Sequence, residues 1–163
     1  MKHRLKDINF TNIIYSEPVL FEGSSLINLS ILNEIIEFQT PKMLIESLKD
    51  NYITLKILPN EACKIFYSKI IELEQALSIH FPNKINNNIF KESIFTVKIP
   101  FRYSKPNVKI YLNDSPFNYY HLSKEMEVIC LLYCDKLWIN EKGLFYNLSV
   151  KEILITKETL KET

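Results

Sequence analysis

Glycine is scarce in this sequence: Gly23 and Gly143 are the only two among 163 residues. A phosphate-binding loop needs several glycines close together, because the backbone must approach the phosphates closely. No nucleophile motif and no pattern of paired carboxylates is present either. We therefore expect a protein that is not an enzyme and that uses no cofactor.

Cysteine and histidine are also few, at three of each, and neither set has the spacing of metal ligands. Cys130 and Cys134 are four residues apart, which on a strand separates them by roughly 13 Å, too far for a disulfide or a shared metal. An odd number of cysteines is typical of a reducing compartment. The sequence therefore predicts no metal site and no disulfide.

Long apolar runs are missing. The longest candidate, residues 126–132, contains Glu127 and has the length of a strand rather than of a membrane span. The basic N-terminus is not followed by an apolar segment, so we expect no secretory signal. The net charge is only +1, which excludes a general polycation and means that any binding to an anionic polymer must come from a local concentration of charge.

Acidic residues are absent from residues 93–113, although the whole chain carries 20 Lys and Arg against 19 Asp and Glu. Tyrosines lie among the cations of this window. Cations beside aromatic rings on a β-surface suit a single-stranded nucleic acid, because the charges meet phosphates and the rings stack on bases. We therefore predict a nucleic-acid-binding surface here, formed by Lys98, Arg102, Tyr103, Lys105, Lys109 and Tyr111.

The window alternates like two strands, which predicts a hairpin with a turn at residues 104–107. In that register Arg102 lies opposite Lys109, and like charges that face each other cost stability unless an anion lies between them. The alternative is an ordinary solvated edge hairpin, in which the lysines and Pro100 discourage aggregation. The outward-facing side chains predicted for the hairpin are Lys98, Arg102, Lys109 and Tyr111, with Lys105 at the tip.

Three features outside the window bear on the same prediction. Lys56 and Tyr52 lie on the polar face of an alternating strand, residues 52–58, and could extend the binding surface. Trp138, the only tryptophan, either stacks on a base or packs in the core, and its apolar neighbours favour the core. Tyr119 and Tyr120 belong either to a binding loop or to a packed one.

One helix is predicted, at about residues 61–80, because Asn60 is a suitable N-cap and apolar residues recur at helical spacing. Strand patterns precede and follow it. A five-stranded Greek-key barrel with its helix between the third and fourth strands has this order. We predict a mainly β, OB-like Greek-key barrel with extra strands and this one helix, although a β-sandwich with a crossover helix has the same order. The predicted apolar stripe of the helix is Ala62, Ile65, Phe66, Ile70, Leu73 and Leu77.

We expect a single domain at residues 1–155 and a short flexible tail at residues 156–163. Nothing between these limits has the composition of a linker or the periodicity of a repeat.

The C-terminal part of the chain, residues 109–155, resembles a known family. It contains Leu137-Trp138-Ile139, the turn Gly143-Leu144-Phe145-Tyr146 and a last strand at residues 150–155. This arrangement is similar to the end of the OB-fold single-stranded DNA-binding proteins of large nucleocytoplasmic DNA viruses and related cytoplasmic replicons. The resemblance implies a cytoplasmic replication protein, in the host cytoplasm or a viral replication compartment, with Trp138 as a base-stacking residue. The mixed charge of residues 157–163 departs from the acidic tail of many such proteins.

Three hypotheses about function follow. The first is non-specific binding of single-stranded DNA, with RNA as a further ligand, with self-association or replication proteins as protein partners, and with no membrane partner. The second is a structural or protein-interaction barrel that binds no nucleic acid. The third is an RNA-binding translation or transcription factor of the same replicon.

Overall fold

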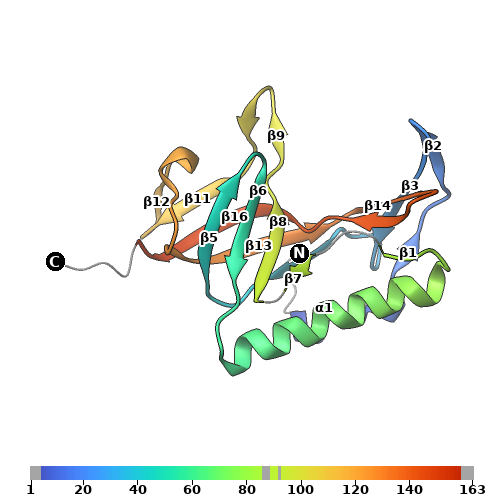
Figure 1. The fold of residues 1–163 in the computed structure, drawn as a ribbon, viewed down its shortest axis with the longest axis horizontal. Helices are drawn as coiled ribbons and strands as arrows, with labels where there is room; N and C mark the ends of the chain where they lie inside the picture. The colour runs from blue at the N-terminus through green and yellow to red at the C-terminus, as the bar shows by residue number, and fades with distance from the viewer. Residues whose placement is uncertain (1–4, 86–88, 92, 159–163) are drawn as a thin grey trace.

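Five strands form a closed barrel in the computed structural model, which describes residues 5–85, 89–91 and 93–158 (Figure 1). Pairing around the ring is antiparallel except between the strand that contains Lys98 and the strand that contains Ser149, which are parallel. In order around the ring, the strands are β5 (Met43–Lys49), β6 (Tyr52–Lys56), β8 (Ile94–Lys98), β16 (Ser149–Lys157) and β13 (Glu127–Cys134).

The predicted fold class is confirmed: the protein is mainly β, at 50% strand and 19% helix, with an OB-like barrel, extra strands and a single α-helix. The helix, α1 (Glu61–His80), follows β6, so within the ring it lies between the second and third strands rather than between the third and fourth. The difference arises because β3 (Ser24–Ser30), one of the strands that precede the helix, belongs to a second sheet and not to the barrel.

The helix begins and ends where the sequence predicted. The Asn60 side chain accepts a hydrogen bond from the backbone N–H of Cys63 at 2.9 Å, which caps the N-terminus. The buried stripe differs from the prediction at its first positions, because Ala62 and Ile65 are exposed while Cys63 is buried. The buried residues of α1 are Cys63, Phe66, Ile70, Leu73 and Leu77.

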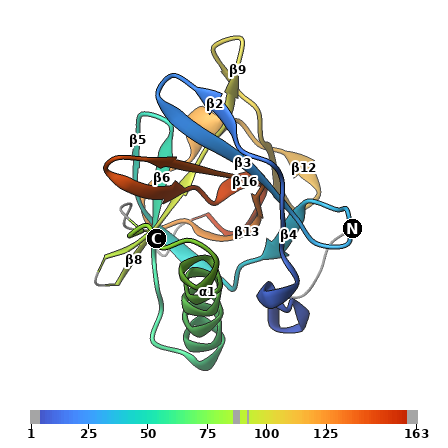
Figure 2. The same cartoon turned by 90° about the vertical axis from the view of Figure 1, so that its right-hand side faces the viewer.

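The second sheet extends from one end of the barrel, and α1 runs beneath both (Figures 1 and 2). The hydroxyl of Tyr146 donates a hydrogen bond of 2.5 Å to Glu74 of the helix. The ring of Tyr15 stacks on His80 at 3.9 Å between centroids. These contacts hold the second sheet against the helix. Its strands are β1 (Ile14–Tyr15), β2 (Val19–Phe21), β3 (Ser24–Ser30), β14 (Lys136–Asn140) and β15 (Gly143–Tyr146).

The connection between β8 and β13 is long and carries several short elements. It contains a hairpin, β9 (Phe101–Arg102) with β10 (Lys105–Pro106), and then β11 (Lys109–Leu112) with β12 (Ser115–Pro116). A 3₁₀ turn, η3 (Tyr119–His121), precedes β13. The remaining elements of the described chain are η1 (Leu5–Asp7), η2 (Phe10–Asn12), β4 (Ile36–Gln39) and β7 (Phe90–Lys91).

The last strand is longer than predicted. β16 continues to Lys157, and the Thr156 hydroxyl donates a hydrogen bond to the backbone carbonyl of Glu127 at 3.0 Å. Thr156 and Lys157 therefore belong to the barrel rather than to a tail. Residues 159–163 of the predicted tail lie outside the described residues. No helix in the described part of the chain is long and apolar enough to cross a membrane.

Candidate nucleic-acid interface

The outer surface of β5, β6 and β8 forms a polar face, which we call the barrel face. Ile53 and Leu55 of β6 and Phe95 and Val97 of β8 point inward and are buried, so the residues between them point outward. Two of the predicted site residues, Lys56 and Lys98, lie on this face. The polar residues of the barrel face are Ser47, Lys49, Tyr52, Thr54, Lys56, Thr96 and Lys98, and the half-buried Leu44 and Ile94 flank Lys56 on the same side.

One row across the barrel face places an aromatic ring between two cations. Tyr52 is the cross-strand partner of Lys49 on β5 and of Lys98 on β8. Directly opposed residues in antiparallel strands have Cβ atoms about 4.5–5.5 Å apart, so the three side chains are immediate neighbours. The Tyr52 side chain is exposed, at 37% of the residue surface. The row therefore offers a ring for a base with an ammonium group on either side for phosphates.

The next row on the barrel face is made of hydroxyl groups. Thr54 lies between Ser47 and Thr96, and the Ser47 and Thr54 hydroxyl oxygens are 2.5 Å apart. Hydroxyl groups can donate hydrogen bonds to phosphate or sugar oxygens without reading the base. This row extends the polar strip from Tyr52 toward Lys56.

The hairpin β9–β10 projects beyond the β5–β6 turn at the end of the barrel face (Figure 1). It follows directly from β8, and the backbone N–H of Ile99 donates to the carbonyl of Asn51 in the β5–β6 turn at 2.7 Å. This bond fixes the base of the hairpin at the edge of the row that contains Tyr52. Lys98 and Arg102 therefore come from one continuous extended segment.

The tip of the hairpin carries three of the predicted site residues, Arg102, Tyr103 and Lys105. The Arg102 guanidinium lies over the Tyr103 ring, 5.4 Å from its centroid, which is a cation–π contact. Tyr103 is 85% exposed, and residues 101–107 contain no acid. The tip thus repeats the cation and ring combination of the barrel face.

The predicted register of this hairpin is wrong. The turn is made by Tyr103 and Ser104, both with positive φ (53° and 64°), and Arg102 pairs with Lys105 instead of Lys109. The sequence signal at residues 104–107 came mainly from Pro106. Pro106 instead lies in β10 opposite Phe101, at a position of the ladder where its missing N–H costs nothing.

Lys109 and Tyr111 do not join the predicted surface. They belong to β11, which pairs in parallel with β16, so that Lys109 faces Glu152 and Tyr111 faces Leu154. The acid beside Lys109 reduces the positive potential there. Tyr111 is half-buried and lies beside Leu154 of β16 rather than on the barrel face.

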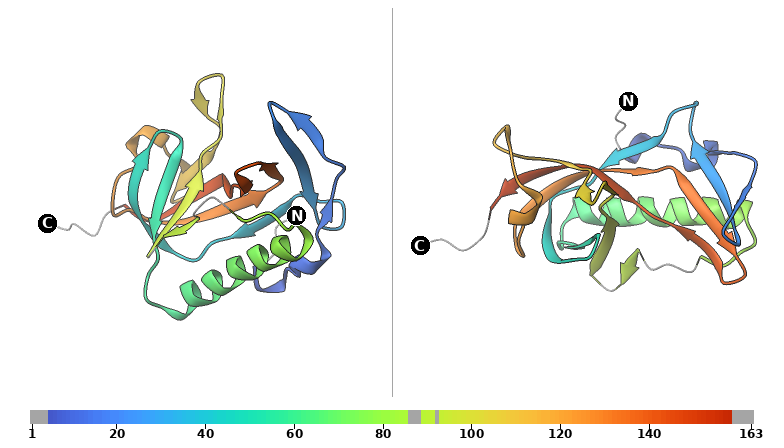
Figure 3. Two further views of the ribbon diagram at one scale, coloured as in Figure 1. Left: turned by 45° about the vertical axis from the view of Figure 1, so that its right-hand side comes forward. Right: turned by 90° about the horizontal axis from the view of Figure 1, so that it is seen from above.

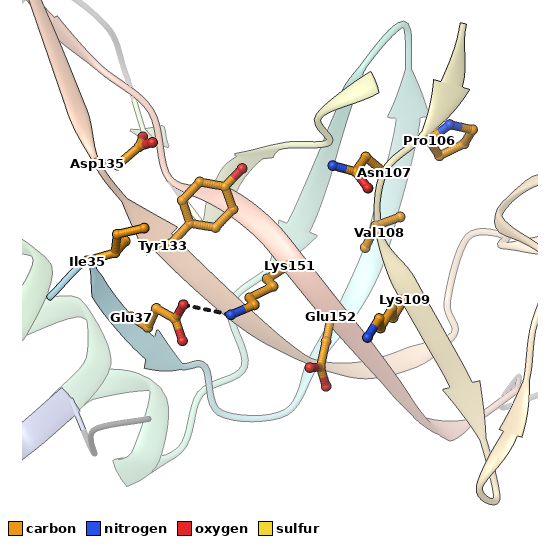
Figure 4. Close-up of a pocket in the computed structure, with 10 residues that line it drawn as sticks. All are labelled: Ile35, Glu37, Pro106, Asn107, Val108, Lys109, Tyr133, Asp135, Lys151 and Glu152. Atoms are coloured by element: carbon orange, nitrogen blue, oxygen red, sulfur yellow. Dashed lines mark hydrogen bonds and ion pairs between the residues drawn. The ribbon is translucent and has the colours of Figure 1, made fainter. Parts of the chain in front are cut away.

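Lys109 lines a hollow of about 530 Å³ between the segment at residues 106–109 and the outer side of β4, β13 and β16 (Figure 4). Glu37 is buried and forms an ion pair with Lys151, whose amine donates a 2.8 Å hydrogen bond to the carboxylate. This hydrogen bond raises the pKa of the Lys151 amine. Burial, followed by the nearby Asp135, raises the pKa of Tyr133. The hollow holds three acids and two lysines, which disfavours a polyanion. Its charged residues are Glu37, Lys109, Asp135, Lys151 and Glu152.

Trp138 lies on β14 in the second sheet, away from the barrel face. Its cross-strand partners are Leu26 and Phe145, and its side chain is half-buried on the outer side of that sheet. The favoured expectation of a core position is therefore wrong. Any stacking on Trp138 would take place on a surface distinct from the barrel face.

The loop before β13 contains the two tyrosines whose role the sequence left open. Tyr119 is half-buried and packs edge-on against Phe101 at 6.0 Å between centroids. Tyr120 is exposed beside it, at 5.3 Å. Tyr119 therefore supports the base of the hairpin.

Lys49 is the member of the central row that sequence reasoning missed. The signal that could have found it is the Asp50-Asn51 turn, since a two-residue turn there places Lys49 opposite Tyr52. Asp50 is the acid nearest to this row in the chain.

Among the described residues, no three His, Cys, Asp or Glu side chains are grouped so that they could hold a metal ion. A scan against protein-family models finds no match, and a search of curated protein sequences finds none either. The functional interpretation therefore depends on the barrel face and the hairpin.

Proposed function

We propose that this protein binds single-stranded DNA across the barrel face and the β9–β10 hairpin. The observation that carries the proposal is the row Lys49, Tyr52 and Lys98, which continues through the same segment of chain to Arg102 and Tyr103. The preferred surface of an OB-fold for oligonucleotides is the face of its second and third strands, which here are β6 and β8. The charges and rings therefore lie where this fold binds its ligand.

The chemistry of the surface favours an unpaired strand. Tyr52 and Tyr103 expose their rings, and a ring can stack only on a base that is not enclosed in a duplex. The lysines and Arg102 contact phosphates, which are the same in every sequence. We expect little sequence preference, and RNA is the natural competitor because it has the same phosphates and flat bases.

The resemblance of the C-terminal part to replication proteins of cytoplasmic DNA viruses supports a role in replication for the same activity. In that role the protein would cover exposed single strands in a cytoplasmic replication compartment. The barrel face suits such a role, because it offers repeated charge and stacking contacts and no catalytic group.

The first test is a titration of fluorescent oligo-dT at about 50 mM salt, followed by increasing salt and by competition with duplex DNA and with RNA. Binding should weaken steeply with salt, because phosphate contacts release counterions. Duplex should compete poorly. An absence of binding at low salt would refute the proposal.

A charge-reversal pair locates the surface. Lys98→Glu with Arg102→Glu should abolish binding, while Lys64→Glu reverses a single charge at an exposed position on the helix, away from the surface, and should leave binding intact. Equal binding by the double variant and the wild type would show that the DNA lies elsewhere. Circular dichroism of each variant confirms that the fold is retained.

A further inference from the structure

The hairpin β2–β3 exposes three consecutive large apolar residues at an open sheet edge. Val19, Leu20 and Phe21 are 59%, 81% and 58% exposed, and together they make up all of β2. Among the described residues, β3 is the only strand that pairs with β2. The hairpin projects from the end of the molecule opposite β12 (Figure 3). An exposed apolar edge strand is a ready template for pairing with another strand.

The outer side of the second sheet continues the apolar surface from this edge. Val19 faces Leu26, Leu26 faces Trp138 and Trp138 faces Phe145, so one apolar row crosses four strands. Lys136 is the only charged residue that the strands of the second sheet place on this side. The row lacks the cations that a nucleic acid needs. An apolar centre with large aromatic residues is typical of a protein interface.

The backbone of β2 is arranged to accept a further strand. The two-residue turn at Glu22 and Gly23 makes Phe21 and Ser24 a hydrogen-bonded pair, and pairs alternate along an antiparallel ladder. Leu20 therefore belongs to a non-hydrogen-bonded pair with Ser25. Its N–H and C=O point away from β3, toward the open edge.

The residues around Leu20 suit the pairing of β2 with β2 of a second copy of the chain about a two-fold axis. In an antiparallel pair centred on Leu20, Val19 of one copy faces Phe21 of the other, which joins the two apolar rows. Glu22 faces Pro18 of the other copy, so no two carboxylates are opposed. A pairing centred on Glu22 would oppose the two Glu22 carboxylates. Charge therefore favours the register centred on Leu20.

We propose that the protein forms a two-fold symmetric homodimer through the edge of β2, with Leu20 of the two copies directly opposed and the apolar rows of the second sheets side by side. A two-fold interface uses the same patch on both copies, so this self-complementary edge suffices without a second surface. Pro18 has no N–H and ends the ladder. The apolar side chains therefore carry most of the interface. The barrel face does not take part, so the dimer is independent of nucleic acid.

A disulfide trap tests the geometry. Cα atoms in a hydrogen-bonded antiparallel pair lie about 5.5 Å apart, which is within the range of a disulfide. Leu20→Cys should form a covalent dimer under mild oxidation, whereas Ile79→Cys, an equally exposed position on the helix, should not. The three native cysteines are buried and free, so they should not compete.

Sedimentation of the full chain over a range of concentrations tests the dimer itself. The wild type should reach twice the mass of one chain as the concentration rises. Leu20→Pro should be monomeric, because proline removes the outward N–H at the centre of the pairing. Val19→Lys with Phe21→Lys should also be monomeric, and it leaves the backbone N–H groups in place. A monomeric wild type at every concentration, or a dimer that persists in the Val19 and Phe21 double variant, would overturn the proposal.

Discussion

Tyr52 and Lys98 are direct cross-strand partners on the outer side of the barrel. They come from strands that are separated in sequence by the whole of α1, and they meet because β6 and β8 are neighbours in the ring. Their side chains differ in what they offer a nucleic acid, since one is a stacking surface and the other a charge. The two contributions can be separated experimentally.

The ring of Tyr52 is expected to stack on a base. Stacking on an aromatic side chain is worth about 1–3 kcal/mol per base, so Tyr52→Ala should weaken oligo-dT binding by about 5- to 150-fold. Tyr52→Phe keeps the ring and should bind nearly as well as the wild type. Tyr67→Ala removes an exposed tyrosine from the helix and is the matched control for fluorescence titrations. Equal losses in the Phe and Ala variants would assign the effect to the hydroxyl.

The charge of Lys98 should contribute to the salt dependence of binding. Each phosphate contact to a single strand contributes about 0.7 to the slope of log K against log salt, so Lys98→Gln should reduce that slope by about this amount. Lys109→Gln should leave the slope unchanged, because Lys109 faces Glu152 on another part of the surface. A reduced slope for Lys109→Gln would return β11 to the interface. Anisotropy titrations at four or more salt concentrations give the slopes.

Local alternation was enough to predict β6, β8 and the sides on which their residues lie. Ile53 and Leu55 alternate with polar residues, and this pattern fixes which side chains reach the barrel face. The helix followed from its cap and its apolar spacing. Lys49 was missed because β5 contains a register shift between Ile45 and Ser47, which breaks the alternation of that strand.

The hairpin register could not be read from the sequence for a different reason. With two glycines in the chain, left-handed turn positions are occupied by other residues, among them Tyr103 and Ser104. Neither residue type signals a two-residue turn. The partner of β11 is β16, about forty residues later, and local patterns carry no information on such distant pairing.

Thr40 lies between β4 and β5, and we expect it to stabilise the contact of this segment with β13. Its hydroxyl accepts a hydrogen bond from the backbone N–H of Cys130 at 2.9 Å, and both residues are buried. Thr40→Val leaves that N–H without this acceptor, which should cost about 1–3 kcal/mol in the free energy of unfolding. Thr96→Val makes the same isosteric change on the barrel face and should cost less. Urea unfolding of both variants measures the difference, and equal costs would contradict this role.

The buried thiols of Cys130 and Cys134 should make the barrel sensitive to alkali. Burial raises the pKa of each thiol to about 12, from 9.0, and Asp135 adds to the effect at Cys134. Between these pKa values the unfolded chain has lost thiol protons that the folded protein keeps. The free energy of unfolding therefore falls as the pH rises above about 9, by up to about 1.4 kcal/mol per pH unit for each thiol.

Urea unfolding at pH 8, 9 and 10 tests this dependence without exceeding the ordinary pKa of tyrosine, which is about 10. Cys130→Ala with Cys134→Ala should be less stable at pH 8, because it leaves small cavities, yet should lose less stability between pH 8 and 10 than the wild type. An equal loss in both proteins would show that other groups cause the alkaline instability. A free energy of unfolding that stays constant to pH 10 in the wild type would contradict the raised thiol pKa values themselves.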